Sequence, residues 1–214
     1  AYAALTENQK KKIENKDFFE IMADNYLEKR YEQLQSAPRK AAHRPSLDTL
    51  LLKNRSYRAY DSQYKVHQIQ LDAMIAVNAR IASGMNAQRL RFRCVTDEAE
   101  SAKVLGLIRM GAALKELSLP LPGTEPQAFI VVCSSVGENQ TVLIDLGISL
   151  QSMLLKAVEM GLGGLIVRNF DHKALQQALD LPLEPIAVLA VGKPAEKVEL
   201  VEVHRGDSLD YYRR

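Results

Sequence analysis

The sequence has little of what most metal sites and disulfide frameworks need, with two cysteines and four histidines in 214 residues. It also has no tryptophan. Cys94 and Cys133 each lie in an apolar, strand-like run without the paired spacing of metal ligands. They therefore indicate small buried side chains, and no metal site is expected. The net charge of +2 gives no reason to expect a nucleic-acid partner. The first residues lack the basic start and long apolar run of a signal peptide, and we expect a cytoplasmic protein.

Residues 141–164 are the stretch around which the chain is organised, and they predict a helix that is apolar on nearly every side. Polar residues recur in it at intervals of three or four and form one narrow stripe: Asp145, Ser149, Ser152, Lys156 and Glu159. Such a helix needs cover from the core or from a second subunit. Charge interrupts the apolar run, and a membrane span needs about 20 mostly apolar residues. We therefore expect no membrane association, and Gly161 is expected to end the helix.

Helical and strand-like segments alternate in residues 46–214 and predict an α+β protein with a small central sheet. Strands are expected at residues 90–96, 128–134, 165–168 and 186–191, with a β-like start to the tail at residue 198. Helices are expected from Ser46, over residues 66–82, from Asp97 to about residue 110, and over residues 172–179 with Asp171 as the cap.

Residues 1–45 differ from the rest and are predicted to form a helical arm followed by a linker. Residues 5–35 are highly charged and have helical spacing, whereas residues 36–45 contain two prolines and break the pattern. The arm is expected to pack on another part of the protein or on a partner subunit. A solvated arm is the alternative. The remaining domain is expected to span residues 46–214.

Two polar clusters are the candidates for chemistry. In residues 54–60 (NRSYRAY), Arg55 and Arg58 offer forked donors to a phosphate or to ring carbonyls, and Ser56 adds a hydroxyl. In residues 83–92 (SGMNAQRLRF), Asn86 and Gln88 lie in a loop between a helix and a strand. The alternatives are a solvated basic turn and an ordinary turn asparagine. No nucleophile motif or phosphate-binding glycine loop lies between a strand and a helix.

Five short elements occur in a fixed order along the chain. They are residues 54–58 (NRSYR), residues 82–92 (ASGMNAQRLRF), Asp145 and Gly147 with Gly161-Leu162-Gly163, Phe170-Asp171 with residues 179–182 (LDLP), and residues 191–194 (VGKP). In this order the chain resembles the nitroreductase family of flavin enzymes from about residue 46 to residue 205. Each element is weak alone, but together they are fairly specific.

The resemblance implies a nitroreductase-like three-layer α/β/α fold, in which a central mixed sheet surrounds a long buried helix in an intertwined homodimer. The family binds FMN non-covalently at the dimer interface. By resemblance, Arg55 and Ser56 contact the flavin phosphate and ribityl chain, whereas Arg58 and Asn86 donate to the polar edge of the ring. The cofactor-binding positions that the resemblance implies are Asn54, Arg55, Ser56, Arg58, Asn86, Gln88, Arg168, Asn169 and Arg205.

The activity implied is transfer of hydride from NADH or NADPH through FMN to a nitroaromatic, a quinone or a similar small-molecule acceptor, with no catalytic side chain. The chain departs from the family pattern at four places: Asn54 replaces an arginine, Ala82 replaces the proline before Ser83, Arg89-Leu90 replaces Pro-Trp, and Asn169 replaces a common glycine. These departures leave two alternatives open. One is a flavin-binding or interaction module with little turnover. The other is a specialised member that dehalogenates its substrate or degrades flavin.

Overall fold

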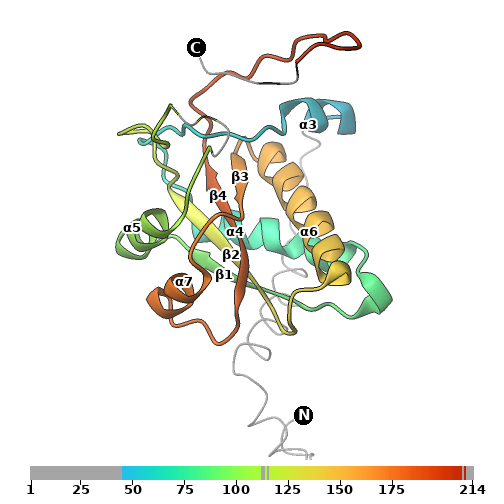
Figure 1. Ribbon diagram of the computed structural model, residues 1–214, viewed down its shortest axis with the longest axis vertical. Helices are drawn as coiled ribbons and strands as arrows, with labels where there is room; N and C mark the ends of the chain where they lie inside the picture. The colour runs from blue at the N-terminus through green and yellow to red at the C-terminus, as the bar shows by residue number, and fades with distance from the viewer. Residues whose placement is uncertain (1–44, 112–113, 115, 209, 211–214) are drawn as a thin grey trace, which may run out of the picture. The chain divides into compact units, whose positions relative to one another are not determined.

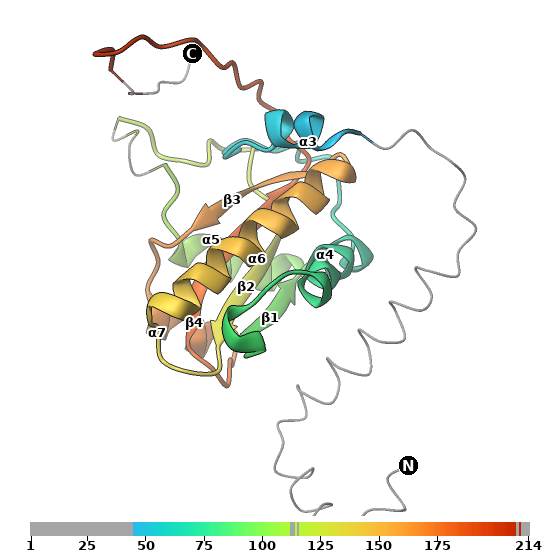
Figure 2. The same cartoon turned by 90° about the vertical axis from the view of Figure 1, so that its right-hand side faces the viewer.

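The structure is a computed structural model that describes residues 45–111, 114, 116–208 and 210 (Figures 1 and 2). The predicted arm lies outside the described residues. The helices are α3 (Leu47–Lys53), α4 (Gln68–Ile75), α5 (Glu98–Leu107), α6 (Gln140–Glu159) and α7 (His172–Ala178), with the 3-10 turns η2 (Ala76–Arg80) and η3 (Gly84–Asn86). The strands are β1 (Leu90–Val95), β2 (Ala128–Ser134), β3 (Gly163–Val167) and β4 (Pro185–Gly192).

The helix starts that the sequence predicts are confirmed by their caps. The side chains of Ser46, Asp97 and Asp171 accept hydrogen bonds from backbone N–H groups three residues later, at 3.2, 3.0 and 2.9 Å. Asn139 caps α6 in the same way. Gly161, with φ of +77°, takes the left-handed conformation directly after α6, as predicted.

The sheet has the strand order β1-β2-β4-β3, and all three pairings between these strands are antiparallel. The expectation of a mixed sheet is therefore wrong for these four strands. β2 and β3 do run in the same direction, as a strand–helix–strand crossover through α6 requires. However, β4 lies between them and pairs antiparallel with both.

Helices cover both faces of the sheet, which confirms the three-layer arrangement (Figures 1 and 2). On one face, α5 and α7 pack over the apolar cluster that includes Phe129, Val131 and Val188. On the other face, α6 and α4 cover the alternate residues of the same strands. Every residue of β2 and β4 is buried. Strands covered on both faces are expected to be continuously apolar, as these are.

α6 turns two of its polar residues inward and leaves apolar residues exposed. Asp145 and Ser149 are only 4% and 1% exposed, whereas Ile144 is 57% exposed and Ile148 is 37% exposed. Leu143, Gly147 and Gln151 are also exposed. The helix thus needs further cover on its outer side, as its composition predicts.

By length and composition α6 could cross a membrane, with a mean hydropathy of 1.5, so the expectation that its charges exclude a span is wrong on that criterion. In the fold, however, α6 packs against β1, β3, α3 and α4. Packing in the protein core accounts for the apolar inner side of the helix.

Two predicted elements differ from the structure. The helix expected over residues 66–82 is α-helical only over α4 and continues as the 3-10 turn η2, where Asn78 donates to the carbonyl of Ile75 at 2.9 Å. A side-chain bond of this kind competes with the regular helical ladder. The tail over residues 198–208 forms no strand, and Leu200 and Val201 are 61% and 77% exposed.

Candidate functional site

Residues 54–58, hereafter the signature segment, run beside the edge of the sheet. Ser56 forms a parallel bridge with Gly164 of β3, and the N–H of Tyr57 donates to the carbonyl of Gly164 at 3.2 Å. The carboxylate of Glu196 accepts from the backbone N–H groups of both Arg58 and Ala59. The signature segment is therefore held by β3 on one side and by the chain after β4 on the other.

Successive side chains of the signature segment point to different sides, as extended backbone requires. Asn54 donates from Nδ2 to Oε1 of Gln151 on the exposed side of α6, at 3.1 Å. The guanidinium of Arg55 instead donates to the carbonyls of Leu51 and Leu52, both at 3.0 Å. Arg55 thus satisfies two C-terminal carbonyls of α3, and the hydroxyl of Tyr57 donates to a third, that of Lys53, at 2.8 Å.

An open groove of 470 Å³ lies on the Arg55 side of the signature segment. Its lining includes Lys53, Arg55, Tyr57 and Lys197, together with Leu162, the residue directly before β3. Asn54, Ser56 and Arg58 do not line it. The structure therefore separates Arg55 from the other predicted residues of the signature segment.

Ser56 is exposed, and Arg58 donates from Nη1 to the carbonyl of Ser56 at 2.9 Å. The guanidinium is partly buried beside the segment. Burial raises the pKa of the Tyr60 hydroxyl above its usual range; nearby Glu196 adds to the rise and Arg58 opposes it. That hydroxyl stays protonated and donates to the carbonyl of Tyr57 at 2.7 Å. It serves as a fixed donor that shapes the segment.

Residues 83–88 form the second cluster, and they are hereafter called the cofactor loop after the FMN contact that the resemblance implies for Asn86. Met85, Asn86 and Gln88 have φ values of 55°, 52° and 46°, a left-handed conformation that side chains disfavour. The N–H of Gln88 donates to Oγ of Ser83 at 3.0 Å, and Nε2 of Gln88 donates to Oδ1 of Asn86 at 2.9 Å. Asn86 and Gln88 are exposed, and they lie between η2 and β1, in the loop that the sequence predicts.

The two clusters contact α6 at different places. The signature segment reaches Gln151, whereas the cofactor loop reaches Asp145 through the N–H of Gly84. Six residues of helix span about 9 Å, and Gln151 is exposed where Asp145 is buried. α3, which leads into the signature segment, lies by the C-terminal end of α6 (Figures 1 and 2). One copy of the chain therefore does not bring the two clusters together.

The last three predicted residues lie apart from both clusters. Arg168 is exposed, and its Nη2 donates to both carboxylate oxygens of Glu138, just before α6, at 3.0 and 2.8 Å. The carbonyl of Asn169 accepts from the N–H of Arg109 at 2.8 Å. Arg205 is exposed in the tail after β4.

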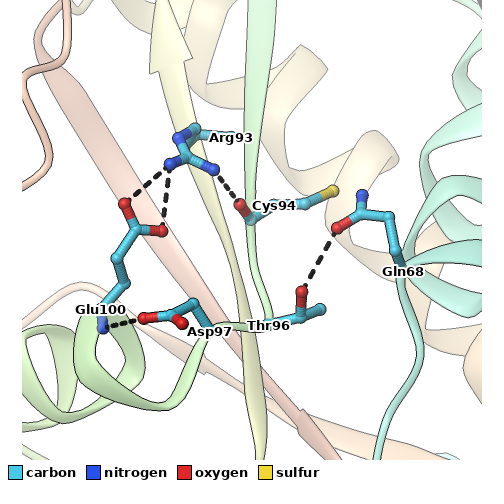
Figure 3. A network of polar contacts seen from close by, with 6 residues as sticks. All are labelled: Gln68, Arg93, Cys94, Thr96, Asp97 and Glu100. Atoms are coloured by element: carbon cyan, nitrogen blue, oxygen red, sulfur yellow. Dashed lines mark hydrogen bonds and ion pairs between the residues drawn. The ribbon is translucent and has the colours of Figure 1, made fainter.

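A polar network of β1, α4 and α5 residues surrounds Cys94 (Figure 3). Arg93 pairs with Glu100 at 2.9 Å and ties β1 to α5. Burial raises the pKa of the Cys94 thiol to about 11, a rise that a hydrogen bond with Gln68 partly offsets. Burial also raises the pKa of Cys133 to about 12. Both groups are thiols near neutral pH, whereas the thiolate is the reactive form.

Within the described residues, no three histidine, cysteine or acidic side chains gather to hold a metal ion.

Sequence reasoning missed two residues that hold the clusters, Glu196 and Gln151, and it named Asp145 without its inward-facing contact with Gly84. Glu196 and Gln151 give no local signal because their partners lie about 100 residues or more away in the chain. Asp145 did give a local signal, since a carboxylate inside an apolar helix needs a hydrogen-bond partner.

Several solved structures share this fold. A nitroreductase family protein from Clostridium difficile 630 is 24% identical, covers 71% of this chain and 86% of its own, and has a TM-score of 0.56. An FMN-dependent nitroreductase from Clostridium difficile R20291 is 17% identical, with coverage of 74% and 98% and a TM-score of 0.57. A structure from Exiguobacterium sibiricum 255-15, described as a nitroreductase in complex with FMN, is 16% identical, with coverage of 77% and 96% and a TM-score of 0.60.

No curated protein matches the chain. The family model described as "Nitroreductase family" matches residues 51–193, which is more than half of the 214 residues and includes both clusters and α6. The matched range, the three-layer fold and the order of the sequence elements agree: the chain belongs to the nitroreductase family.

Proposed function

We propose that the protein is an FMN-dependent oxidoreductase that takes hydride from NADH or NADPH and reduces a nitroaromatic, a quinone or a similar small molecule. Family membership supports an oxidoreductase, and similar structures are described as FMN-dependent or as holding FMN. The observation that carries the proposal is the exposed apolar side of α6, which is flanked by hydrogen-bond donors of the signature segment.

The residues present fit a flavin because they combine an apolar surface with polar donors. An isoalloxazine ring has flat apolar faces and a polar edge, and FMN adds a phosphate. Ile144 and Ile148 supply exposed apolar surface. The hydroxyl of Ser56 and the guanidinium of Arg58 supply donors, and the exposed amides of Asn86 and Gln88 add more. Arg168, Asn169 and Arg205 remain proposed contacts, whereas Arg55 in its present position caps α3.

We propose further that two copies pair through the exposed side of α6. A pair related by a two-fold axis brings the cofactor loop of one copy toward the signature segment of the other, because the two clusters contact α6 at separate places. The site is then shared between two subunits. Burial of Leu143, Ile144 and Ile148 in this contact supplies part of the driving force.

Bound FMN supplies the hydride-accepting chemistry, so the side chains need only bind, orient and tune it. The positive charge of Arg58 favours an electron-rich ring beside it. Asn86 and Gln88 orient the ring by hydrogen bonds. The covered α6 surface excludes water from one side of the site. We place this activity in the cytoplasm, where both nicotinamide donors are available.

The test is a visible spectrum of the purified full chain, followed by anaerobic addition of NADH and of NADPH. A yellow protein whose flavin band bleaches, and which then reduces p-nitrobenzoate or a quinone, supports the proposal. A colourless protein that takes up no added FMN refutes it.

Two outcomes point to the alternatives. Bound FMN that neither nicotinamide reduces indicates a flavin-binding module; the neutral Asn54 amide, held by Gln151, is the observation that favours it. Reduction followed by loss of halide from a halogenated substrate, or by breakdown of flavin itself, indicates a specialised member. Product analysis separates these two from nitroreduction.

A further inference from the structure

Asp145 is a charged residue on the largely apolar inner side of α6, which also carries Ser149. It is 4% exposed, and its Oδ1 accepts from the N–H of Gly84 at 2.8 Å. Its Oδ2 is buried and has no hydrogen-bond partner among the described residues. A buried carboxylate that is only half satisfied costs stability relative to an apolar side chain. This cost indicates that Asp145 has a role other than stabilising the fold, and that this role concerns the segment to which it is hydrogen-bonded.

What Asp145 holds is the start of the cofactor loop. Three of the loop's six residues have the left-handed backbone that side chains disfavour: Met85, Asn86 and Gln88. Such residues persist only where the surroundings enforce them. Within the loop, the N–H of Gln88 donates back to Ser83, but a bond inside the loop does not fix the loop relative to α6. The bond from Gly84 to Asp145, 61 residues away, joins the loop to a rigid helix.

The packing around Gly84 fits this anchor. A Cβ at Gly84 would lie 2.5 Å from Cγ2 of Thr141 and 3.6 Å from Oδ1 of Asp145. Thr141 and Asp145 are one turn apart on α6, so together they frame the glycine. The absent side chain lets the loop backbone reach the carboxylate, because any Cβ would meet the Thr141 methyl first.

A second tether, one turn further along, offers a matched comparison. Ser149 is 1% exposed, and its Oγ donates a hydrogen bond to Oδ1 of Asn78 at 2.6 Å. This bond joins α6 to η2 and not to the cofactor loop. Removing it perturbs a buried polar contact of α6 without touching residues 83–88.

We propose that Asp145 is a positioning residue for the cofactor: its carboxylate fixes residues 83–88 so that Asn86 and Gln88 are presented to the flavin. The inference rests on the proposed function, because Asn86 and Gln88 matter only if flavin binds. Asp145 itself acts through the backbone of Gly84. Its contribution is therefore to cofactor affinity, not to the reduction step.

The first experiment compares Asp145→Ala, Asp145→Asn and Ser149→Ala in the full chain. Amide exchange of Gly84, measured by NMR without flavin, is expected to accelerate at least tenfold in Asp145→Ala and to stay unchanged in Ser149→Ala. The FMN dissociation constant is expected to rise at least tenfold in Asp145→Ala only. Asp145→Asn keeps one carbonyl acceptor and is expected to bind FMN within threefold of the wild type. Both alanine variants are expected to lower the melting temperature, because each leaves a buried partner, the N–H of Gly84 or Oδ1 of Asn78, without its hydrogen bond.

The second experiment keeps Asp145 and moves the loop instead, which covers the case in which Asp145→Ala does not fold. Gly84→Ala is expected to weaken FMN binding at least tenfold. Thr141→Ser removes the methyl group that the new Cβ would meet. The double variant Gly84→Ala/Thr141→Ser is expected to recover most of the affinity, whereas Thr141→Ser alone leaves it within twofold.

Equal FMN affinity in the wild type and Asp145→Ala would overturn this inference and leave the proposed function intact. Equal loss of affinity in Ser149→Ala would also overturn it, since general loosening of α6 would then suffice. A wild-type protein that binds no FMN would instead remove the proposed function, and with it the cofactor role of Asp145.

Discussion

The side-chain amide of Asn54 donates to Oε1 of Gln151 at 3.1 Å and joins the first residue of the signature segment to the exposed side of α6. Asn54 occupies the position where the nitroreductase pattern has an arginine. A neutral amide in this place provides a hydrogen bond but no charge for a phosphate. The relationship makes position 54 a direct test of where the phosphate binds.

Asn54→Arg is expected to strengthen FMN binding three- to tenfold, because a guanidinium adds a charge-assisted hydrogen bond to the phosphate. Titration of flavin fluorescence at low and at high salt measures the effect, and salt should shrink the gain. Gln151→Ala is the control, since it removes the partner of Asn54 without adding charge; it should change affinity less than twofold. Weaker binding in Asn54→Arg would place the phosphate elsewhere.

The two arginines of the signature segment are expected to differ when each is replaced by alanine. Arg58→Ala should raise the FMN dissociation constant at least tenfold and lower the flavin reduction potential by about 30 mV, which for a two-electron couple is a tenfold shift between the two states. Arg55→Ala should lower the melting temperature, because Arg55 binds two carbonyls of α3, yet leave flavin affinity within twofold. A potential that Arg58→Ala does not change would show that its charge lies away from the ring.

Local signals in the sequence predicted the elements, whereas contacts between distant residues decided how they face. The place of α6, its end at Gly161 and the caps at Ser46, Asp97 and Asp171 depend on neighbours within a few residues, and these predictions are confirmed, although residues 163 and 164 belong to β3 and not to the helix. The inward turn of Asp145 depends on Gly84, which is 61 residues away. Periodicity finds a polar stripe but does not tell which side of the helix it faces.

Two further differences between the sequence prediction and the structure also arise from contacts between distant residues. The direction of the strands around α6 was predictable from the crossover, but the insertion of β4 between β2 and β3 was not, because it depends on pairing along whole strands. Arg55 and Arg58 are equivalent as donors in the sequence. Only the end of α3, with its carbonyls of Leu51 and Leu52, distinguishes them. The resemblance identified the family, but it did not say which donors other parts of the chain already use.

The exposed apolar side of α6 predicts the subunit contact. Ile144→Asp is expected to convert a dimer into monomers, because it puts a charge into a surface that the dimer would bury. Light scattering after size exclusion measures the mass. Gln177→Asp, an equal charge change at an exposed position of α7, should leave the dimer unchanged. A charge at Leu154 would instead disrupt the core, since this side chain is 6% exposed and packs inward. A dimer that survives Ile144→Asp would require another interface.

The buried thiols predict a loss of stability at high pH. Burial raises the pKa of Cys94 from 9.0 to about 11, so between these values the unfolded chain loses this proton and the folded chain keeps it. The free energy of unfolding therefore falls as pH rises above 9, by up to about 1.4 kcal/mol per pH unit for each such thiol. Below pH 9 both states hold the proton and the effect vanishes.

Cys94→Ala isolates this contribution. Urea unfolding at pH 8.5 and 10.5 should show a smaller fall in stability for the variant than for the wild type, by about 1–2 kcal/mol. Tyr60 and Cys133, whose pKa values burial also raises, act equally in both proteins and cancel in the comparison. An identical fall in both would mean that Cys94 is open to water in the folded protein.

Gly164 lies where β3, β4 and α6 meet, and its lack of a side chain is required there. A Cβ would lie 2.5 Å from the carbonyl oxygen of Ala190 and 2.9 Å from Cδ2 of Leu154. The first contact is to the backbone of a central strand, which cannot yield, so β3 itself must shift. Gly164→Ala is expected to lower the free energy of unfolding by about 3 kcal/mol.

Because Ser56 bridges to Gly164, the same shift should displace the signature segment and weaken FMN binding. Gly106→Ala is the matched control: it lies in α5 with nothing within 4 Å of the new Cβ and should stabilise the protein by about 0.5–1 kcal/mol. Urea unfolding and FMN titration on both variants measure the two effects. Loss of stability without loss of FMN affinity in Gly164→Ala would show that the signature segment does not depend on β3 for its position.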